Sequence, residues 1–295
     1  MSIATEAPPR AADSGSTPVL SLRGISKTFG AVSALTDIDL DVGAGEVVAV
    51  VGDNGAGKST LVKVLAGVHR QSSGTITFEG KPVSVPTPRE AHELGIATVF
   101  QDLALCENLN VIENLFLGQE IGSLRLDSVQ METRSWELLR QLAAKIPTVR
   151  MPVASLSGGQ RQTVAIARSL LGEPKIIVLD EPTAALGVAQ TAEVLNLIER
   201  LRERRLGVVM ISHNMADVKA VADTVAVLRL GRNNGFFRVA DVSSEDIIAA
   251  ITGATDNAVS QRAAARAAPP PPDDGSTATS TAVPQKPASL SQELS

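Results

Sequence analysis

A glycine-rich loop with a lysine and two hydroxyl residues, 52–60, follows the apolar run 47–51 and reads Gly-Asp-Asn-Gly-Ala-Gly-Lys-Ser-Thr. Glycines let backbone N–H groups turn inward and surround phosphate oxygens, because they adopt backbone angles that other residues avoid. The pattern G-x-x-x-x-G-K-[ST] after a strand therefore predicts a nucleoside triphosphate as the ligand. A glycine-rich turn that binds nothing is the alternative, and the flanking strand and helix weaken it.

The residues of this loop have separate expected tasks. A helix expected over 58–66 points its positive N-terminal end at the phosphates. Lys58 can reach the β- and γ-phosphates, and Ser59 can offer its hydroxyl to Mg²⁺. The residues of the loop expected to bind the nucleotide are Gly52, Asn54, Gly55, Ala56, Gly57, Lys58, Ser59 and Thr60.

Two acids, Asp180 and Glu181, end an apolar strand expected over 176–179. A fully apolar strand is buried in its sheet, so the acids emerge at the carboxyl edge, where open α/β sheets bind ligands. Asp180 is placed to hold Mg²⁺ through water, and Glu181 to orient or deprotonate the attacking water. On their own, two acids before Pro182 could simply cap a helix. The phosphate loop makes the catalytic interpretation the stronger one.

A second helix start follows Leu156, with the sequence Ser157-Gly158-Gly159-Gln160. It offers free N–H groups and a hydroxyl that could bind an anion. On spacing alone, an ordinary N-capped helix explains it better.

Residues 156–160 resemble the LSGGQ signature of the ABC-transporter ATPases, a family that shares the phosphate loop and the acids after a buried strand. Gln101 resembles the family's Q-loop glutamine, which implies contact with Mg²⁺ and the attacking water. His213 resembles its switch histidine, which implies contact with the γ-phosphate. Phe29 stands where the family places an aromatic residue that stacks on adenine. The similarity covers residues 18–253.

The resemblance also implies a pairing of subunits. In the family, two ATPase domains pair head to tail, and the signature of one completes the nucleotide site of the other. Residues 157–160 would then bind ATP held by a second copy, in a homodimer, or by a paralogue. One residue departs from the family pattern, because Gly187 stands where an acid is usual. His69 and His92 match no motif and are expected at the surface.

The segment after Gln101 suggests a membrane partner. In transporter ATPases, the insert at about 103–154 receives a helix from the membrane subunit, and the mixed residues 102–109 suit a docking groove. Their leucines could instead pack the insert's own core, and both can hold. Residues 101–120, 184–187 and 212–215 look like the ATPases of bacterial sugar importers of the ribose, xylose and fructose type.

This similarity implies ATP hydrolysis coupled to monosaccharide import. It implies integral-membrane permease subunits as partners, a periplasmic solute-binding protein as an indirect one, and a peripheral place on the cytoplasmic face of the inner (plasma) membrane. Soluble ABC ATPases of translation or DNA repair generally have two domains or a long coiled coil and basic surfaces. Exporter ATPases are more often fused to or encoded with a membrane domain. Both remain alternatives to the importer.

Composition agrees with these expectations. The net charge is −5 without a basic block, so no nucleic-acid partner is expected. Aromatic residues make up 2% and tyrosine is absent, which argues against base stacking as the main activity. No apolar run reaches the length of a membrane span and no secretory segment is evident, so we expect a cytoplasmic chain.

Strands that alternate with helices predict an α/β fold, and the resemblance implies a P-loop NTPase (RecA-like) core with a mostly parallel sheet. The early strands suggest an antiparallel β layer beside it, and 103–154 a helical subdomain. Residues 1–17 and 254–295, rich in Ala, Pro, Ser and Thr, are expected to be disordered tails around an ordered domain, 18–253. The expected strands are 19–22, 35–42, 47–51, 75–78, 96–100, 176–179, 208–211 and 225–228.

Overall fold

The computed structural model describes residues 17–122 and 125–254, which belong to the unit Met1–Asp256. Apart from residues 17 and 254, the two expected tails lie outside the described residues, and their disorder stays a prediction.

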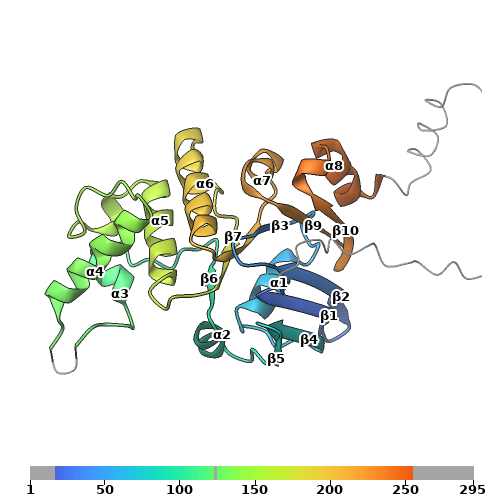
Figure 1. Cartoon of the computed structure of the whole chain (residues 1–295), viewed down its shortest axis with the longest axis horizontal. Helices are drawn as coiled ribbons and strands as arrows, with labels where there is room; N and C mark the ends of the chain where they lie inside the picture. Colours follow the sequence, from blue (N-terminus) through green and yellow to red (C-terminus); the bar gives the residue numbers. More distant parts are fainter. Residues whose placement is uncertain (1–16, 123–124, 255–295) are drawn as a thin grey trace, which may run out of the picture. The chain divides into compact units, whose positions relative to one another are not determined.

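A six-stranded sheet in the order β10-β9-β3-β8-β7-β6 forms the centre of this unit (Figure 1). Its strands are parallel except for β10, which forms an antiparallel hairpin with β9. The predicted mostly parallel sheet is therefore confirmed. The strands are β3 (Val47–Val51), β6 (Ile96–Val99), β7 (Ile176–Asp180), β8 (Gly207–Ile211), β9 (Thr224–Arg229) and β10 (Arg232–Arg238).

A second, antiparallel sheet in the order β2-β1-β4-β5 confirms the expected additional layer. β1 and β2 are longer than predicted, because register shifts between residues 22 and 28 interrupt the alternation that marks a strand. The short β5 is not among the predicted strands. The strands are β1 (Leu20–Phe29), β2 (Val32–Val42), β4 (Ser73–Phe78) and β5 (Lys81–Val83).

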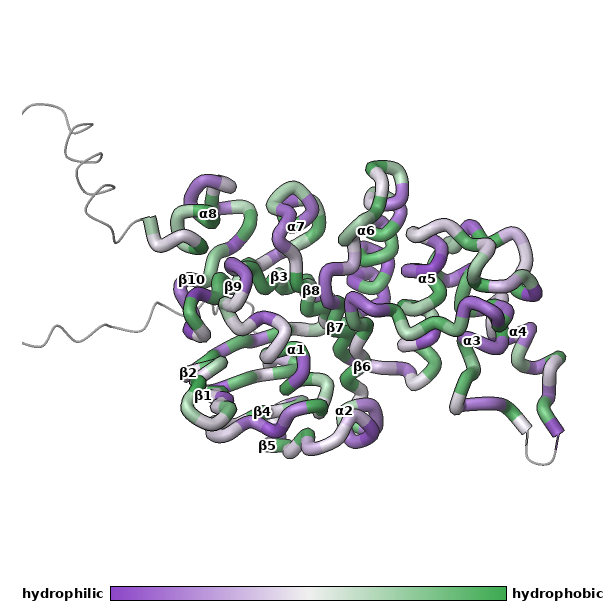
Figure 2. The backbone as a smooth tube through the Cα atoms, turned by 180° about the vertical axis from the view of Figure 1, so that it is seen from behind, coloured by the Kyte–Doolittle hydropathy of each residue, from purple (hydrophilic) through white to green (hydrophobic). Residues whose placement is uncertain are grey.

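Two apolar cores lie on the two faces of the six-stranded sheet, whose central strands are strongly hydrophobic (Figure 2). Along β3, Val47, Ala49 and Val51 enter one core, and Val48 and Val50 enter the other. This alternation follows from the two-residue period of a strand. Both faces are thus covered, which anchors the strand ends that carry the site.

Helices cover both faces of the sheet. The core between the two sheets contains α1 and α2, and the opposite core contains α5 to α8 (Figure 1). Within residues 17–122 and 125–254, no helix has the length and apolar character needed to cross a membrane. The helices are α1 (Lys58–Leu65), α2 (Pro88–Leu94), α5 (Gly158–Ser169), α6 (Val188–Glu203), α7 (Met215–Val221) and α8 (Ser244–Thr252).

The insert at 103–154 is less helical than predicted. It contains α3 (Val111–Phe116), α4 (Ser128–Gln141) and a short 3₁₀ turn, Val153–Ser155. The chain on either side of α3 and α4 pairs through its backbone instead, since Val153 N donates to Leu109 O and Val111 N to Met151 O. Pro147 and Pro152 interrupt helix formation in the second of these segments.

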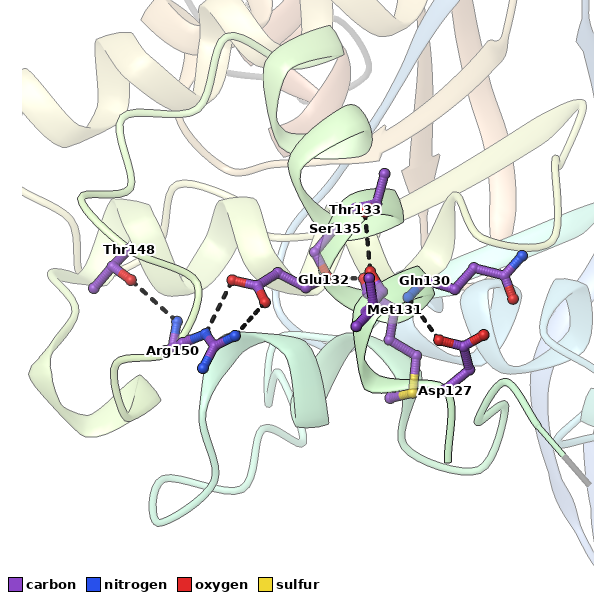
Figure 3. A network of polar contacts seen from close by, with 9 residues as sticks. Asp127, Gln130, Met131, Glu132, Thr133, Ser135, Thr148 and Arg150 are labelled. Atoms are coloured by element: carbon purple, nitrogen blue, oxygen red, sulfur yellow. Dashed lines mark hydrogen bonds and ion pairs between the residues drawn. The ribbon is translucent and has the colours of Figure 1, made fainter. Parts of the chain in front are cut away.

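Polar contacts fasten the segment before α5 to α4 (Figure 3). Arg150 binds both carboxylate oxygens of Glu132, at 3.0 Å from Nε and 2.6 Å from Nη2, and its backbone N–H donates to Thr148 Oγ1. At the start of α4, Asp127 accepts a hydrogen bond from Gln130 N. These contacts fix the chain that leads into residues 156–160.

Candidate nucleotide site

Four predicted motifs follow the carboxyl ends of four neighbouring strands. In the order β3-β8-β7-β6, these ends lead into the phosphate loop, His213, the acids Asp180 and Glu181, and Gln101. Parallel strands place their carboxyl ends at one edge of the sheet, where open α/β sheets bind ligands. Residues far apart in the sequence are thus brought to one edge.

Lys58 is held by the loop that precedes it. Its Nζ donates to Gly52 O at 2.7 Å and to Asp53 O at 3.0 Å, and the residue is 8% exposed. A buried ammonium needs such oxygen partners, because an unpaired buried charge is costly. The loop therefore keeps a positive charge at the start of α1, whereas Ser59 beside it is exposed.

The glycines of the loop fit a phosphate site. A Cβ at Gly52 would lie 2.2 Å from Leu228 O, and one at Gly57 would lie 2.8 Å from Ala34 O. Gly57 is the N-cap of α1 at φ +104°, and neither a capping side chain nor an acid occupies the first turn of the helix. The N–H groups of the first turn therefore have no side-chain acceptor, as an anion-binding helix start requires.

The two acids have different surroundings. Burial raises the pKa of Asp180, and the neighbouring charge of Glu181 raises it further, while Lys58 and Lys63 oppose the shift. Glu181 adopts a left-handed backbone, φ +49°, and its N–H donates to Ile211 O at 3.0 Å. That bond joins the ends of β7 and β8.

Glu181 and His213 form a pair that the sequence analysis missed. Glu181 Oε1 lies 3.3 Å from His213 Nδ1, with His213 68% exposed and Glu181 23% exposed. Both residues follow neighbouring strands, and that adjacency was the signal that could have revealed the contact.

The residues expected to hold Mg²⁺ are Ser59, Gln101 and Asp180. Gln101 and Ser59 are exposed and Asp180 is half-buried. Among the described residues there is no cluster of three or more His, Cys, Asp or Glu that could hold a metal ion. A single carboxylate fits Mg²⁺, which characteristically takes one or two carboxylates together with substrate phosphates and water.

Phe29, the expected base-stacking residue, ends β1 and is 43% exposed. Its ring contacts His69 at 5.1 Å between centroids. His69 is half-buried against this ring and thus less exposed than expected, whereas His92 is exposed as predicted.

The segment 157–160 forms a capping box at the start of α5. Ser157 Oγ accepts from Gln160 N, and Gln160 Oε1 accepts from Ser157 N. Gln160 Nε2 donates to Lys145 O at 2.7 Å, so its amide is used within the helical subdomain. Within the described parts of the chain, no hydrogen bond joins 157–160 to the phosphate loop.

Gly158 and Gly159 allow a close approach of the segment after β7. A Cβ at Gly158 would lie 2.8 Å from Leu186 Cδ2, and one at Gly159 would lie 3.2 Å from Gln190 Cβ. Gly187 in the same segment is the N-cap of α6, at φ −73° and ψ 163°. A Cβ there would meet nothing within 4 Å.

A hollow of about 300 Å³ lies between α2, β6 and α5. It is lined mostly by apolar residues, among them Leu103 and Leu117, and by polar residues that include Asp102, Gln119 and Arg168. Arg168 donates to Leu103 O and Ala104 O, each at 2.9 Å, and burial lowers the pKa of its guanidinium. Leu103 also packs on the apolar core, which confirms the core-packing interpretation of this leucine, and its role in docking stays a prediction.

A family profile described as "ABC transporter" matches residues 35–184, about half of the chain. The chain belongs to the ABC transporter family. The resemblance inferred from the motifs is confirmed.

Three relatives are sugar-import proteins by name. The chain is 42% identical over 235 residues to the xylose/arabinose import ATP-binding protein of Sulfolobus acidocaldarius, covering 79% of this chain and 94% of that protein. It is 42% identical over 248 residues to the fructose import ATP-binding protein of Rhizobium meliloti, covering 81% and 95%. It is 38% identical over 242 residues to the ribose import ATP-binding protein of Clostridium perfringens, covering 81% of this chain and 48% of that longer protein.

Solved structures agree with the fold. A nucleotide-free ATP-binding cassette from an ABC transporter has a TM-score of 0.70 at 27% identity, covering 80% of this chain and 96% of that one. The dimeric structure of MJ0796, a bacterial ABC transporter cassette, has a TM-score of 0.64 at 25% identity, covering 75% and 98%. The predicted P-loop NTPase fold is confirmed, and the ABC domain is a nucleotide-binding one.

Proposed function

We propose that this chain is the ATP-hydrolysing subunit of an ABC importer for a monosaccharide, with the cassette spanning residues 18–253. The observation that carries the proposal is the gathering of the phosphate loop, Asp180, Glu181 and His213 at the ends of β3, β7 and β8. A cationic loop, a metal-binding acid and a base beside it are the parts that phosphoryl transfer to water requires.

In this proposal, different residues bind the phosphates, activate the water and hold Mg²⁺. Lys58 and the amides of the phosphate loop bind the β- and γ-phosphates. Glu181 orients and deprotonates the attacking water, and His213 holds that carboxylate and approaches the γ-phosphate. Ser59, Asp180 and Gln101 hold Mg²⁺, which neutralises the charge that develops on the phosphate oxygens.

Two cassettes act together in this proposal. Residues 157–160 of one copy complete the nucleotide site of the other, in a homodimer or with a related ATPase. The capped start of α5 is compatible with this, because the Ser157 hydroxyl accepts a hydrogen bond from Gln160 N through a lone pair and keeps its own proton for an anion. The MJ0796 cassette, which is similar in fold, has a dimeric structure.

Import of a sugar rests on the relatives, which are named for xylose/arabinose, fructose and ribose. We propose the hollow beside Arg168 as the docking site for a helix of a permease subunit, because its mostly apolar lining can receive the apolar face of such a helix. This contact would hold the chain at the cytoplasmic face of the membrane. The periplasmic solute-binding protein would then act on the chain only through the permease.

The test is capture of the permease from native membranes by the tagged full chain, identified by mass spectrometry. Leu117 lines the hollow and is 46% exposed, so Leu117→Glu should reduce recovery of the permease. Leu126 is 65% exposed outside it, and Leu126→Glu is the matched control. Recovery of ribosomal or DNA-repair proteins, or of an exporter membrane domain, in place of an importer permease would contradict the proposal.

A further inference from the structure

A histidine that no motif explains lies against the ring of Phe29. The ring centroids of Phe29 and His69 are 5.1 Å apart, with an angle of 73° between the ring planes. This edge-to-face arrangement is a favoured geometry for aromatic pairs. The contact restricts rotation of a ring that is otherwise 43% exposed at the end of a strand.

Lys27 adds a second contact to the same ring. Its Nζ lies 4.9 Å from the ring centroid of Phe29, within the range of a cation–π interaction. The same Nζ donates to Arg70 O at 2.8 Å, next to His69 in the chain. Lys27 therefore ties the Phe29 ring to the segment that carries the histidine.

This segment is fastened on both sides. Toward β1, Ser72 N donates to Ser26 O at 2.7 Å, and Thr28 N donates to Ser72 Oγ at 3.1 Å. Toward α1, His69 N donates to Lys63 O at 3.0 Å. Since α1 runs from Lys58 to Leu65, it joins the phosphate loop to the short segment that carries His69.

The Phe29 hairpin flanks the phosphate loop. Phe29 pairs with Val32 across a tight turn, and Ala34 lies two residues further along β2. That step is about 7 Å at the rise of a strand. Gly57 closely approaches Ala34, as its constructed Cβ would lie 2.8 Å from Ala34 O. The hairpin that carries Phe29 therefore lies beside the phosphate loop, with Phe29 and Val32 closer to its turn than Ala34, which Gly57 approaches.

We infer that His69 is a positioning residue for the nucleotide base, which fixes the ring of Phe29 so that its open part can stack on a planar base. The inference rests on the proposed function and extends it to the recognition of the base. A ring that is held in advance loses little freedom when the base stacks on it, so affinity improves without a new polar contact. The ligand class is a nucleotide with an aromatic base, and bare polyphosphates gain nothing from His69.

Isothermal titration calorimetry of the full chain tests this with two ligands, Mg-ATP and magnesium tripolyphosphate. His69→Gln removes the aromatic ring and keeps side-chain size, His69→Phe keeps a ring, and His92→Ala removes an exposed histidine elsewhere. Ordering one further side chain on binding corresponds to about a 2- to 10-fold weaker affinity. We expect this loss for ATP with His69→Gln, no change for tripolyphosphate, and affinities within twofold of wild type for His69→Phe and His92→Ala.

Steady-state kinetics provide a second readout, in which His69→Gln raises KM for ATP by the same factor and leaves kcat within twofold. Unchanged ATP affinity in His69→Gln, or an equal loss for both ligands, would overturn the inference while the proposed ATPase stands. A wild-type chain that binds neither ligand would overturn both.

Discussion

The carboxylate of Glu181 and the imidazole of His213 lie 3.3 Å apart, measured between Oε1 and Nδ1. The backbone bond from Glu181 N to Ile211 O fixes this pair, because it joins the chain just after β7 to the end of β8. A general base whose orientation is held by a second side chain acts with it as a unit.

Replacing Glu181 with Gln should lower kcat for ATP hydrolysis by about 10²- to 10⁴-fold, since the base is lost while the shape remains. ATP binding should persist, so the variant should form a dimer at saturating Mg-ATP. Light scattering coupled to size-exclusion chromatography measures this. A variant that stays monomeric would argue against paired cassettes, and the exposed Glu173→Gln provides the control.

Because His213 holds the carboxylate of Glu181, part of its contribution should disappear once Glu181 is replaced. We expect the ratio of kcat for His213→Ala to wild type to be much smaller than one, and the same ratio measured in a Glu181→Gln background to lie closer to one. Single-turnover rates of the four proteins form the required cycle. Two independent, multiplicative losses would contradict coupling between the side chains.

Replacing Lys58 with Ala should weaken ATP binding by about 10- to 100-fold, the range for hydrogen bonds to a charged group. Lys63 lies on the same helix and is exposed, so Lys63→Ala is the matched control. Calorimetric titration with Mg-ATP gives the affinities. Full affinity in Lys58→Ala would refute the assignment of the phosphate loop.

Replacing Asp180 with Asn should stabilise the chain without Mg-ATP at neutral pH. The pKa of Asp180 is raised on folding, so its protonated form favours the folded state. That contribution is complete below the pKa in the unfolded chain and is lost as pH rises through the folded-state pKa. The gain in Tm from Asp180→Asn should therefore be larger at pH 8 than at pH 4.5, as measured by scanning calorimetry. Asp241→Asn, at an exposed aspartate, is the control.

Replacing Gly187 with Asp should restore an N-cap acceptor to α6 and stabilise the fold by a few tenths of a kcal/mol. Gly187→Asn supplies a similar cap without the charge. If the missing carboxylate weakens communication between two sites, only Gly187→Asp should raise the cooperativity of ATP hydrolysis. Equal Hill coefficients in the two variants would show that this charge is irrelevant.

The sequence predicts the phosphate loop and the central strands well because their determinants are local. Gly52, Gly57 and Lys58 define the loop, and apolar runs such as β7 are buried on both faces wherever they pack. Once these strands pack in parallel, their carboxyl ends lie at one edge of the sheet, and the site residues that follow them are brought together there.

Other parts depend on partners outside the segment itself. β10, with the sequence RNNGFFR, shows no clear alternation and forms through its hairpin with β9. Asn114 is fully buried because its side chain bonds to backbone atoms of Cys106, Leu109 and Asn110, which hold a non-helical segment in the insert. The contact of His69 with Phe29 depends on the pairing of β1 with β4, which no single segment reveals.

Helix α5 carries Arg168 near one end and follows Ser157 directly at the other. Eleven helical steps separate them, about 16 Å at the rise of an α-helix. The guanidinium of Arg168 binds the backbone of Leu103 and Ala104 beside the hollow. A displacement of that segment would therefore be transmitted along α5 to its N-terminus. In the proposed transporter, α5 would therefore couple movement of the permease to the contact of Ser157 with ATP.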